Sequence, residues 1–167
     1  MQPVFHVVVN RLEERRVASA EDIDYLCNYL AGLPVFWVHV TGADGERGGA
    51  LDVVVESNRA LVAFLDIGRG IKLASRDETC TQRGIVSFRN DAYPDLELDQ
   101  IEVHCRDVIS PERALSILRH FLITGEAIDL VRWPPDDWDE GGDPSHVDEA
   151  RRLGEKGQCL PGEEIPF

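Results

Sequence analysis

The chain has 167 residues, of which 43% are hydrophobic, and its 31 acidic and 17 basic residues give a formal net charge of −14. The hydrophobic fraction excludes a wholly disordered chain, and the lack of an 18-residue apolar run leads us to expect no membrane-spanning helix. The carboxylate surplus disfavours nucleic-acid binding, which needs Lys and Arg against phosphates, and favours either a basic partner or a role in solubility alone.

Hydrophobic periodicity predicts the elements of the first half of the chain. Residues 4–9 are rich in β-branched side chains and predict a strand, followed by a charged connector over residues 11–16. Ser19 and Asp22 have the spacing of a capping box that begins a helix, and Gly32 ends it. Further strands are expected over residues 35–40, 51–56, 60–67 and 71–74, with a glycine-rich loop over 42–49 and tight turns at 57–58 and 68–70.

The second half begins with a long polar stretch over residues 75–99, whose one short apolar piece lies at 85–88. Loops of this length in a compact domain are usually functional. A strand is expected over 101–105, and a short last strand or anchor near 130–133. Between them a complete helix is predicted: Ser110 caps it, Pro111 suits its first position, and Gly125 supplies the left-handed residue that ends it.

These elements predict an α+β fold, an antiparallel sheet of about five to six strands with a meander at its centre, packed by two helices. We expect this domain to span residues 1–133. Residues 134–167 contain ten acidic and three basic residues with frequent Pro and Gly, and we interpret them as an acidic extension. The alternative is a solvated, weakly ordered tail.

No motif for phosphate binding, metal binding or nucleophilic catalysis occurs in the chain. The cysteines at 27, 80, 105 and 159 form no metal-ligand spacing. In a strand, His104 and Cys105 would point to opposite faces and could not form a dyad. Asp66 precedes a glycine turn and is interpreted as a turn-forming carboxylate. We therefore expect no enzyme, no cofactor and no metal.

Several short motifs, in their order and spacing, resemble the Imm1 family of bacterial immunity proteins. The motifs are Ala63-Phe64-Leu65-Asp66-Ile67-Gly68, Val108-Ile109-Ser110-Pro111-Glu112-Arg113-Ala114-Leu115, Phe121-Leu122-Ile123-Thr124-Gly125 and Val131-Arg132-Trp133. The resemblance covers about residues 4–133; residues 134–167 depart from the family's usual ending. It implies an antitoxin that binds a cognate polymorphic toxin domain, often a nucleic-acid-targeting deaminase or nuclease, and blocks its active site.

The acidic charge agrees with this role, because such toxins commonly carry basic substrate grooves that carboxylates could occupy. We expect toxin-binding residues in the 75–98 stretch and in the extension, with Trp138 as an anchor and carboxylates around it. The candidates are Asp77, Glu78, Asp91, Tyr93, Asp95, Asp136, Asp137, Trp138, Asp139 and Glu140. Packing against its own domain is the alternative for Trp138, and Trp37 and Trp133 are expected in the core.

The expected partner is thus a toxin protein, with no direct nucleic-acid or membrane binding. Residues 1–10 lack the charged start and cleavage-like site of a secretion signal, so we expect a cytoplasmic location. The alternative function is a non-immunity acidic adaptor or regulator of the same fold.

Overall fold

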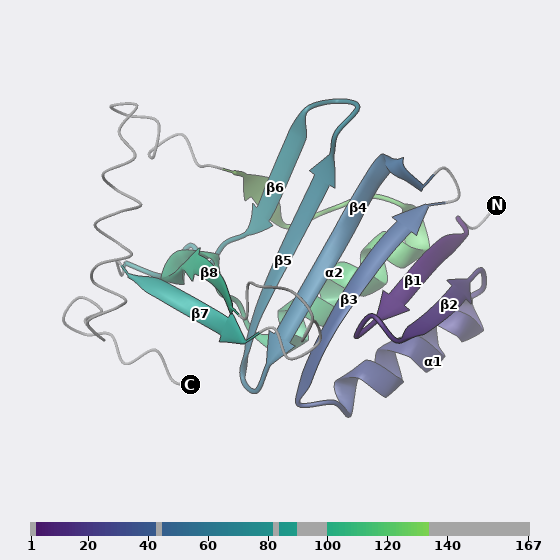
Figure 1. Ribbon diagram of the computed structural model, residues 1–167, viewed down its shortest axis with the longest axis horizontal. Coiled ribbons are helices and arrows are strands. Elements are labelled where there is room, and N and C mark those ends of the chain that lie inside the picture. The colour runs from purple at the N-terminus through teal and green to yellow at the C-terminus, as the bar shows by residue number, and fades with distance from the viewer. Residues whose placement is uncertain (1–2, 43–44, 82–83, 90–99, 134–167) are drawn as a thin grey trace.

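The computed structural model describes residues 3–42, 45–81, 84–89 and 100–133 (Figure 1). Its elements in chain order are β1 (Phe5–Val9), β2 (Glu13–Val17), α1 (Ala20–Ala31), β3 (Val35–Gly42), β4 (Gly45–Glu56), β5 (Arg59–Asp66), β6 (Ile71–Ser75), β7 (Ile85–Arg89), β8 (Gln100–His104), the short 3-10 helix η1 (Cys105–Asp107), α2 (Pro111–Thr124) and β9 (Leu130–Arg132). The α+β class expected from the sequence is confirmed.

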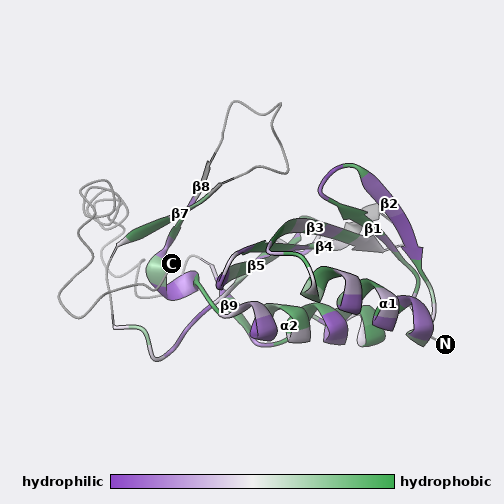
Figure 2. Cartoon of the chain, turned by 90° about the horizontal axis from the view of Figure 1, so that it is seen from below, coloured by the Kyte–Doolittle hydropathy of each residue, from purple (hydrophilic) through white to green (hydrophobic). Residues whose placement is uncertain are grey.

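Seven strands form one antiparallel sheet in the order β2-β1-β3-β4-β5-β6-β9, and β7 and β8 form a second, two-stranded sheet. The meander of β3 to β6 lies within the large sheet, as expected. Figure 2 shows α1 and α2 side by side along one face of this sheet, with the β7–β8 hairpin rising from the opposite face. Both helices thus pack on one face of the sheet, and among the described elements the β7–β8 hairpin covers part of the other face (Figure 2).

Alternation along the central strands builds the main core against the helices. On β3, Val38 and Val40 are fully buried toward the helices, and Leu51 and Val53 of β4 lie opposite them in register. The helices supply the other side of this core with Ile23, Leu26, Cys27, Leu30, Ala114, Ile117, Leu118, Phe121 and Leu122. A period of two along the strands meets a period of 3.6 along the helices, so the apolar faces of both kinds of element pack against each other.

Both helices begin and end where the sequence predicts. The Asp22 backbone N–H donates to Ser19 Oγ at 3.1 Å, and the Ser19 N–H donates to the Asp22 carboxylate at 3.1 Å, which completes the capping box. Ser110 Oγ accepts from the Arg113 N–H at 3.2 Å, and Gly125 ends α2 with φ +77°. These caps satisfy backbone groups that each helix would otherwise leave unpaired.

The charged connector expected over residues 11–16 is wrong, because much of it belongs to β2. Asn10 adopts a positive φ of 52° in the reversal, and β2 then pairs with β1 along its whole length. An edge strand tolerates charged residues, since one side of it faces solvent. The Arg15 guanidinium lies 4.6 Å from the ring centroid of Tyr29 on α1, so its stem and charge cover the helix.

The glycine-rich loop expected over residues 42–49 is also wrong, since β4 already begins at Gly45. Gly49 lies within this strand at φ +96°, and the ring of Phe64 on the neighbouring β5 occupies the space beside it. A Cβ at this position would overlap with the Cζ atom of Phe64. Gly49 therefore does not end the strand, and its lack of a side chain leaves room for the aromatic ring of Phe64.

The long polar loop expected over residues 75–99 contains a strand, β7, that pairs with β8 from Ile85↔His104 to Arg89↔Gln100. A second core lies between this hairpin and the open side of the large sheet. Its buried members are Val54, Leu61, Val86, Phe88 and Cys105. The short apolar piece at 85–88 is thus a strand whose inward side chains have their own core.

Arg59 ties the hairpin to the large sheet. Its Nη2 donates to Glu56 Oε1 at 3.0 Å and to the backbone carbonyl oxygen of Ser87 on β7. The same guanidinium lies 4.8 Å from the ring centroid of Phe88. One side chain therefore joins the β4–β5 hairpin to β7 by charge, hydrogen bonding and stacking.

Trp133, the last described residue, is held in place by contacts with Lys72 and Asp107. Its backbone N–H donates to the Lys72 carbonyl at 2.9 Å, and the Lys72 ammonium lies 3.9 Å from its ring centroid. Its side chain also hydrogen-bonds the carboxylate of Asp107, which is 2% exposed. Burial raises the pKa of Asp107 to about 6, although the charge of Arg106 and the Trp133 bond act in the opposite direction.

The substitution Gly49→Ala should lower the free energy of unfolding by about 1–3 kcal/mol, because the added Cβ meets the Phe64 ring and the backbone is strained. Urea denaturation measures the loss. Gly48→Ala is the matched control: nothing lies within 4 Å of its Cβ position, and its stability should change by less than about 0.5 kcal/mol. Equal losses in both variants would contradict this account.

Asp107→Asn should alter how stability depends on pH. Because the folded pKa lies above the unfolded value of 3.8, wild-type stability from this group is fully present below pH 3.8 and is lost as the pH rises through 6. The asparagine does not titrate. The variant should therefore gain about 2–3 kcal/mol relative to wild type between pH 4 and pH 7 in urea titrations.

Asp22→Asn is the control, and we expect it to change stability in the opposite direction. Hydrogen bonds from the backbone of Ala18 and from Ser19 lower the pKa of Asp22, so wild-type stability from this group grows as the pH rises above the lowered value. This variant should lose stability relative to wild type toward neutral pH. A shift in the same direction for both variants would show that the burial of Asp107 is not the cause.

Candidate protein-binding surface

Most of the net negative charge belongs to two segments of the chain that lie outside the described residues. Residues 90–99 contain four acidic residues and no basic one, and residues 134–167 add ten acidic and three basic residues. These two segments carry −11 of the net −14, so the remainder of the chain is close to balance at −3. The charge that would steer a basic partner is therefore concentrated next to β7, β8 and β9 in the chain.

Two of the ten predicted binding residues lie in the described part of the chain, directly after β6. Asp77 is half-buried: its N–H donates to the Arg106 carbonyl at 2.7 Å, and its Oδ1 accepts from the Thr79 N–H at 3.0 Å and the Thr79 hydroxyl at 2.6 Å. Glu78 is exposed. Asp77 thus shapes a turn against η1, whereas Glu78 presents its carboxylate to solvent.

Both carboxylates act on a nearby cation of α2. The pKa of Arg113 is raised, first by its hydrogen bonds to Asp129 and then by the charges of Asp77 and Glu78. Arg113 donates from Nε and Nη2 to the two oxygens of Asp129 at 2.8 and 3.0 Å. This bidentate pair fixes Arg113 within the fold, so the charge of Glu78 is only partly balanced by it.

The other eight predicted residues lie outside the described residues. They are Asp91, Tyr93 and Asp95 in the 90–99 segment, and Asp136, Asp137, Trp138, Asp139 and Glu140 in the extension. The structure therefore brings together only Asp77 and Glu78 of the predicted set, and the others stay predictions.

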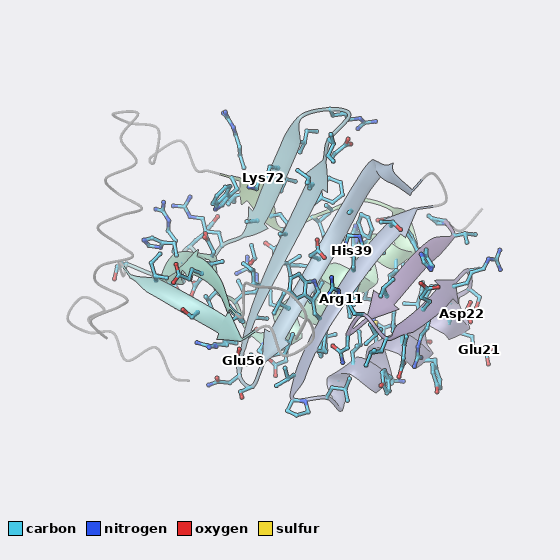
Figure 3. All side chains as sticks on the ribbon, in the orientation of Figure 1. Arg11, Glu21, Asp22, His39, Glu56 and Lys72 are labelled. Atoms are coloured by element: carbon cyan, nitrogen blue, oxygen red, sulfur yellow. The ribbon has the colours of Figure 1, made fainter. Side chains whose placement is uncertain are left out.

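The open side of the large sheet carries a polar cluster that the sequence analysis missed. The Asp52 Oδ1 atom accepts a hydrogen bond from Trp37 Nε1 at 3.0 Å and lies 2.8 Å from His39 Nδ1. All three side chains are partly buried, and Figure 3 shows His39 near the middle of this face. Asp52 thereby holds an indole and an imidazole in fixed orientations at the surface.

The cluster depends on strand register. His39 and Asp52 are direct partners across β3 and β4, and Trp37 lies two residues along on the same face. Each is adjacent in the chain to a fully buried valine or leucine that faces the helices. The alternation of apolar and polar residues in β3 signals a two-sided strand, but the pairing of His39 with Asp52 requires the register itself.

The β7–β8 hairpin flanks this cluster. Trp37 packs against the second core beneath the hairpin, so it joins the polar cluster to an apolar interior. Partly buried aromatic residues beside ordered polar groups are typical of the centres of protein interfaces. The open face beside the hairpin is therefore a second candidate surface, in addition to the acidic segments.

The expectation that His104 and Cys105 lie on opposite faces of a strand is wrong. Cys105 begins η1 instead, and its Sγ atom lies 3.9 Å from His104 Nδ1. The same Nδ1 accepts from the Arg106 N–H at 3.2 Å. The imidazole therefore caps the 3-10 turn, a local hydrogen bond that competes with continuation of the strand. Asp66, as expected, accepts from the Arg69 N–H at 3.1 Å and forms its turn.

Among the described residues no three His, Cys, Asp or Glu side chains gather in the arrangement of a metal site. In the same part of the chain, neither helix has the length and apolar character needed to cross a membrane. A scan of the sequence against protein-family models finds no matching family. A search of curated proteins finds no match either.

Proposed function

We propose that this protein is an immunity protein that binds a cognate bacterial polymorphic toxin domain and neutralises it by occluding its active site. The toxin we propose is a deaminase or nuclease that acts on nucleic acid. The observation that carries the proposal is the separation of charge along the sequence, with −11 of the net −14 on two segments and −3 on the remainder of the chain. The resemblance of residues 4–133 to the Imm1 family supports it.

An acidic inhibitor suits a toxin of this kind for a physical reason. A groove that binds nucleic acid presents Lys and Arg side chains to phosphates. Carboxylates placed in that groove neutralise the same cations, exclude the phosphates and accelerate encounter by long-range attraction. Inhibition then requires only occupancy, so the antitoxin needs no chemistry of its own.

The described fold contributes the fixed points from which the carboxylates act. Glu78 is exposed next to the turn that Asp77 forms against η1, and the 90–99 segment joins β7 to β8. The extension begins directly after Trp133, which Lys72 and Asp107 hold. In the proposed complex, Trp138 is the apolar anchor, and the acidic residues on either side of it pair with toxin cations.

The test is to purify the full chain with the toxin domain encoded by the adjacent reading frame. We expect a stable complex, and we expect cells that produce the toxin domain to survive only when this protein is also produced. Capture of a polypeptide without toxic activity would favour the adaptor alternative. A toxin domain that remains active in the presence of excess protein would contradict the proposal.

Association with this toxin domain should slow several-fold as ionic strength rises from about 0.01 to 0.15 M, because the screening length falls from roughly 30 to 8 Å. Stopped-flow fluorescence measures the rate.

Neutralising Asp136, Asp137, Asp139 and Glu140 to their amides should reduce both the rate at low salt and its salt dependence. Neutralising the exposed Glu21 and Glu126 on the helical side is the control and should leave the salt dependence nearly unchanged. A flat salt response would indicate an apolar interface.

A further inference from the structure

A pocket of about 500 Å³ opens where the two helices meet one end of the sheet. The C-terminus of α1 and the N-terminus of α2 form two of its walls, and the β4–β5 turn forms a third. The lining residues that decide what it can bind are Leu30, Leu33, Phe36, Val55, Glu112 and Leu115. Neither the proposed function nor the sequence analysis uses this site.

The floor of the pocket is apolar and continuous with the main core. Leu30, Phe36 and Val55 are at most 2% exposed, and the partly buried Leu33 and Leu115 pack against them. Leu33 and Leu115 therefore provide the apolar surface that is still open to solvent, from which the methylene stem of a long side chain would displace water with little polar loss. The floor therefore suits an aliphatic chain of a few carbons.

The rim offers hydrogen-bond acceptors and negative potential. Glu112 in the first turn of α2 is exposed, and α1 carries no basic residue in its last turn. The N–H groups of Gly32 and Leu33 donate to the carbonyls of Tyr29 and Leu30, but no cation of α1 offsets the partial negative charge of its C-terminus. The positive end of α2 is largely occupied: Ser110 caps the Arg113 N–H, and Pro111 has no N–H to offer. The rim therefore favours a cation over an anion.

We infer that this pocket receives a long cationic side chain, an arginine or a lysine, of the basic protein partner. The stem lies on the apolar floor and the charged group pairs with Glu112 and the α1 carbonyl end. This inference rests on the proposed function for the identity of the partner, a toxin domain with a basic surface. It adds a specific recognition point to the long-range attraction of the acidic segments.

The pocket is also connected to the region where we propose that the toxin binds. The turn residues Ser57 and Asn58 line it, and Arg59 of the same hairpin, which pairs with Glu56, donates to the carbonyl of Ser87 on β7. Strand β7 leads directly into residues 90–99. Arg59 therefore joins one wall of the pocket to the strand that precedes an acidic segment in the chain.

The test uses the full chain, isotopically labelled, and n-butylguanidinium chloride as the probe in NMR titrations. We expect saturable shifts of the amides of Gly32, Leu33, Glu112 and Leu115, with a Kd on the order of 1–10 mM for so small a ligand. Sodium butyrate, with a similar chain and opposite charge, should leave these amides unshifted. Shifts confined to other residues, or equal shifts with both probes, would overturn the inference.

Three variants, two at Glu112 in the first turn of α2 and one at Glu126 beyond its C-terminus, sharpen the test. Glu112→Gln should weaken butylguanidinium binding about threefold, and Glu112→Lys should abolish it, because a surface ion pair has only modest strength while a like charge repels. Glu126→Gln, at an exposed position beyond the other end of α2, should not change it. Equal weakening in Glu112→Gln and Glu126→Gln would refute a role for the rim.

The pocket inference and the proposed function can fail separately. If the probe fails to bind while the toxin complex still forms, the pocket inference alone is wrong. If the probe binds but no toxin complex forms, the proposed function alone is wrong.

Discussion

The two-sidedness of β3 and β4 is the constraint on which the rest of this structure depends. Because successive side chains point to opposite faces, Val38 and Val40 enter the helical core while Trp37 and His39 must face away from it. A shift of one residue in register would bury an imidazole and a carboxylate among leucines and valines, at a cost of several kcal/mol for unpaired groups. The same alternation therefore specifies the register, the main core and the polar cluster.

Local signals in the sequence predict the helices and the meander well. The start of α1 is marked by Ser19 and Asp22, and the start and end of α2 are marked by Ser110 and Gly125. The hydrogen bonds at these positions join residues only a few positions apart, so the local sequence is enough to predict them. Asp66 forms its turn for the same reason. The fold class follows from these elements, since two amphipathic helices and an antiparallel sheet have few ways to bury their apolar faces.

Other features could not be predicted from the neighbouring sequence, because they depend on contacts with residues far away in the chain. β2 is charged and becomes a strand only because the β1 backbone is available as a partner, and Arg15 has an aromatic helix to cover. Gly49 reads as a loop residue until the Phe64 ring is known to lie beside it. β8 pairs with β7 rather than with a strand of the large sheet, and the His104 side chain accepts a hydrogen bond from the Arg106 N–H where that strand ends. The candidate cluster of Trp37, His39 and Asp52 likewise exists only once β3 and β4 are in register.

The way in which Trp133 is held has a consequence for how two acidic segments would act on one partner. Lys72 and Asp107 fasten the residue from which the extension departs, and the paired β7 and β8 fasten both ends of the 90–99 segment. The residues to which both segments are attached therefore belong to one described fold. In the complex that we propose, contact by one segment would raise the effective concentration of the target of the other, so that two individually weak contacts would combine into an avid one.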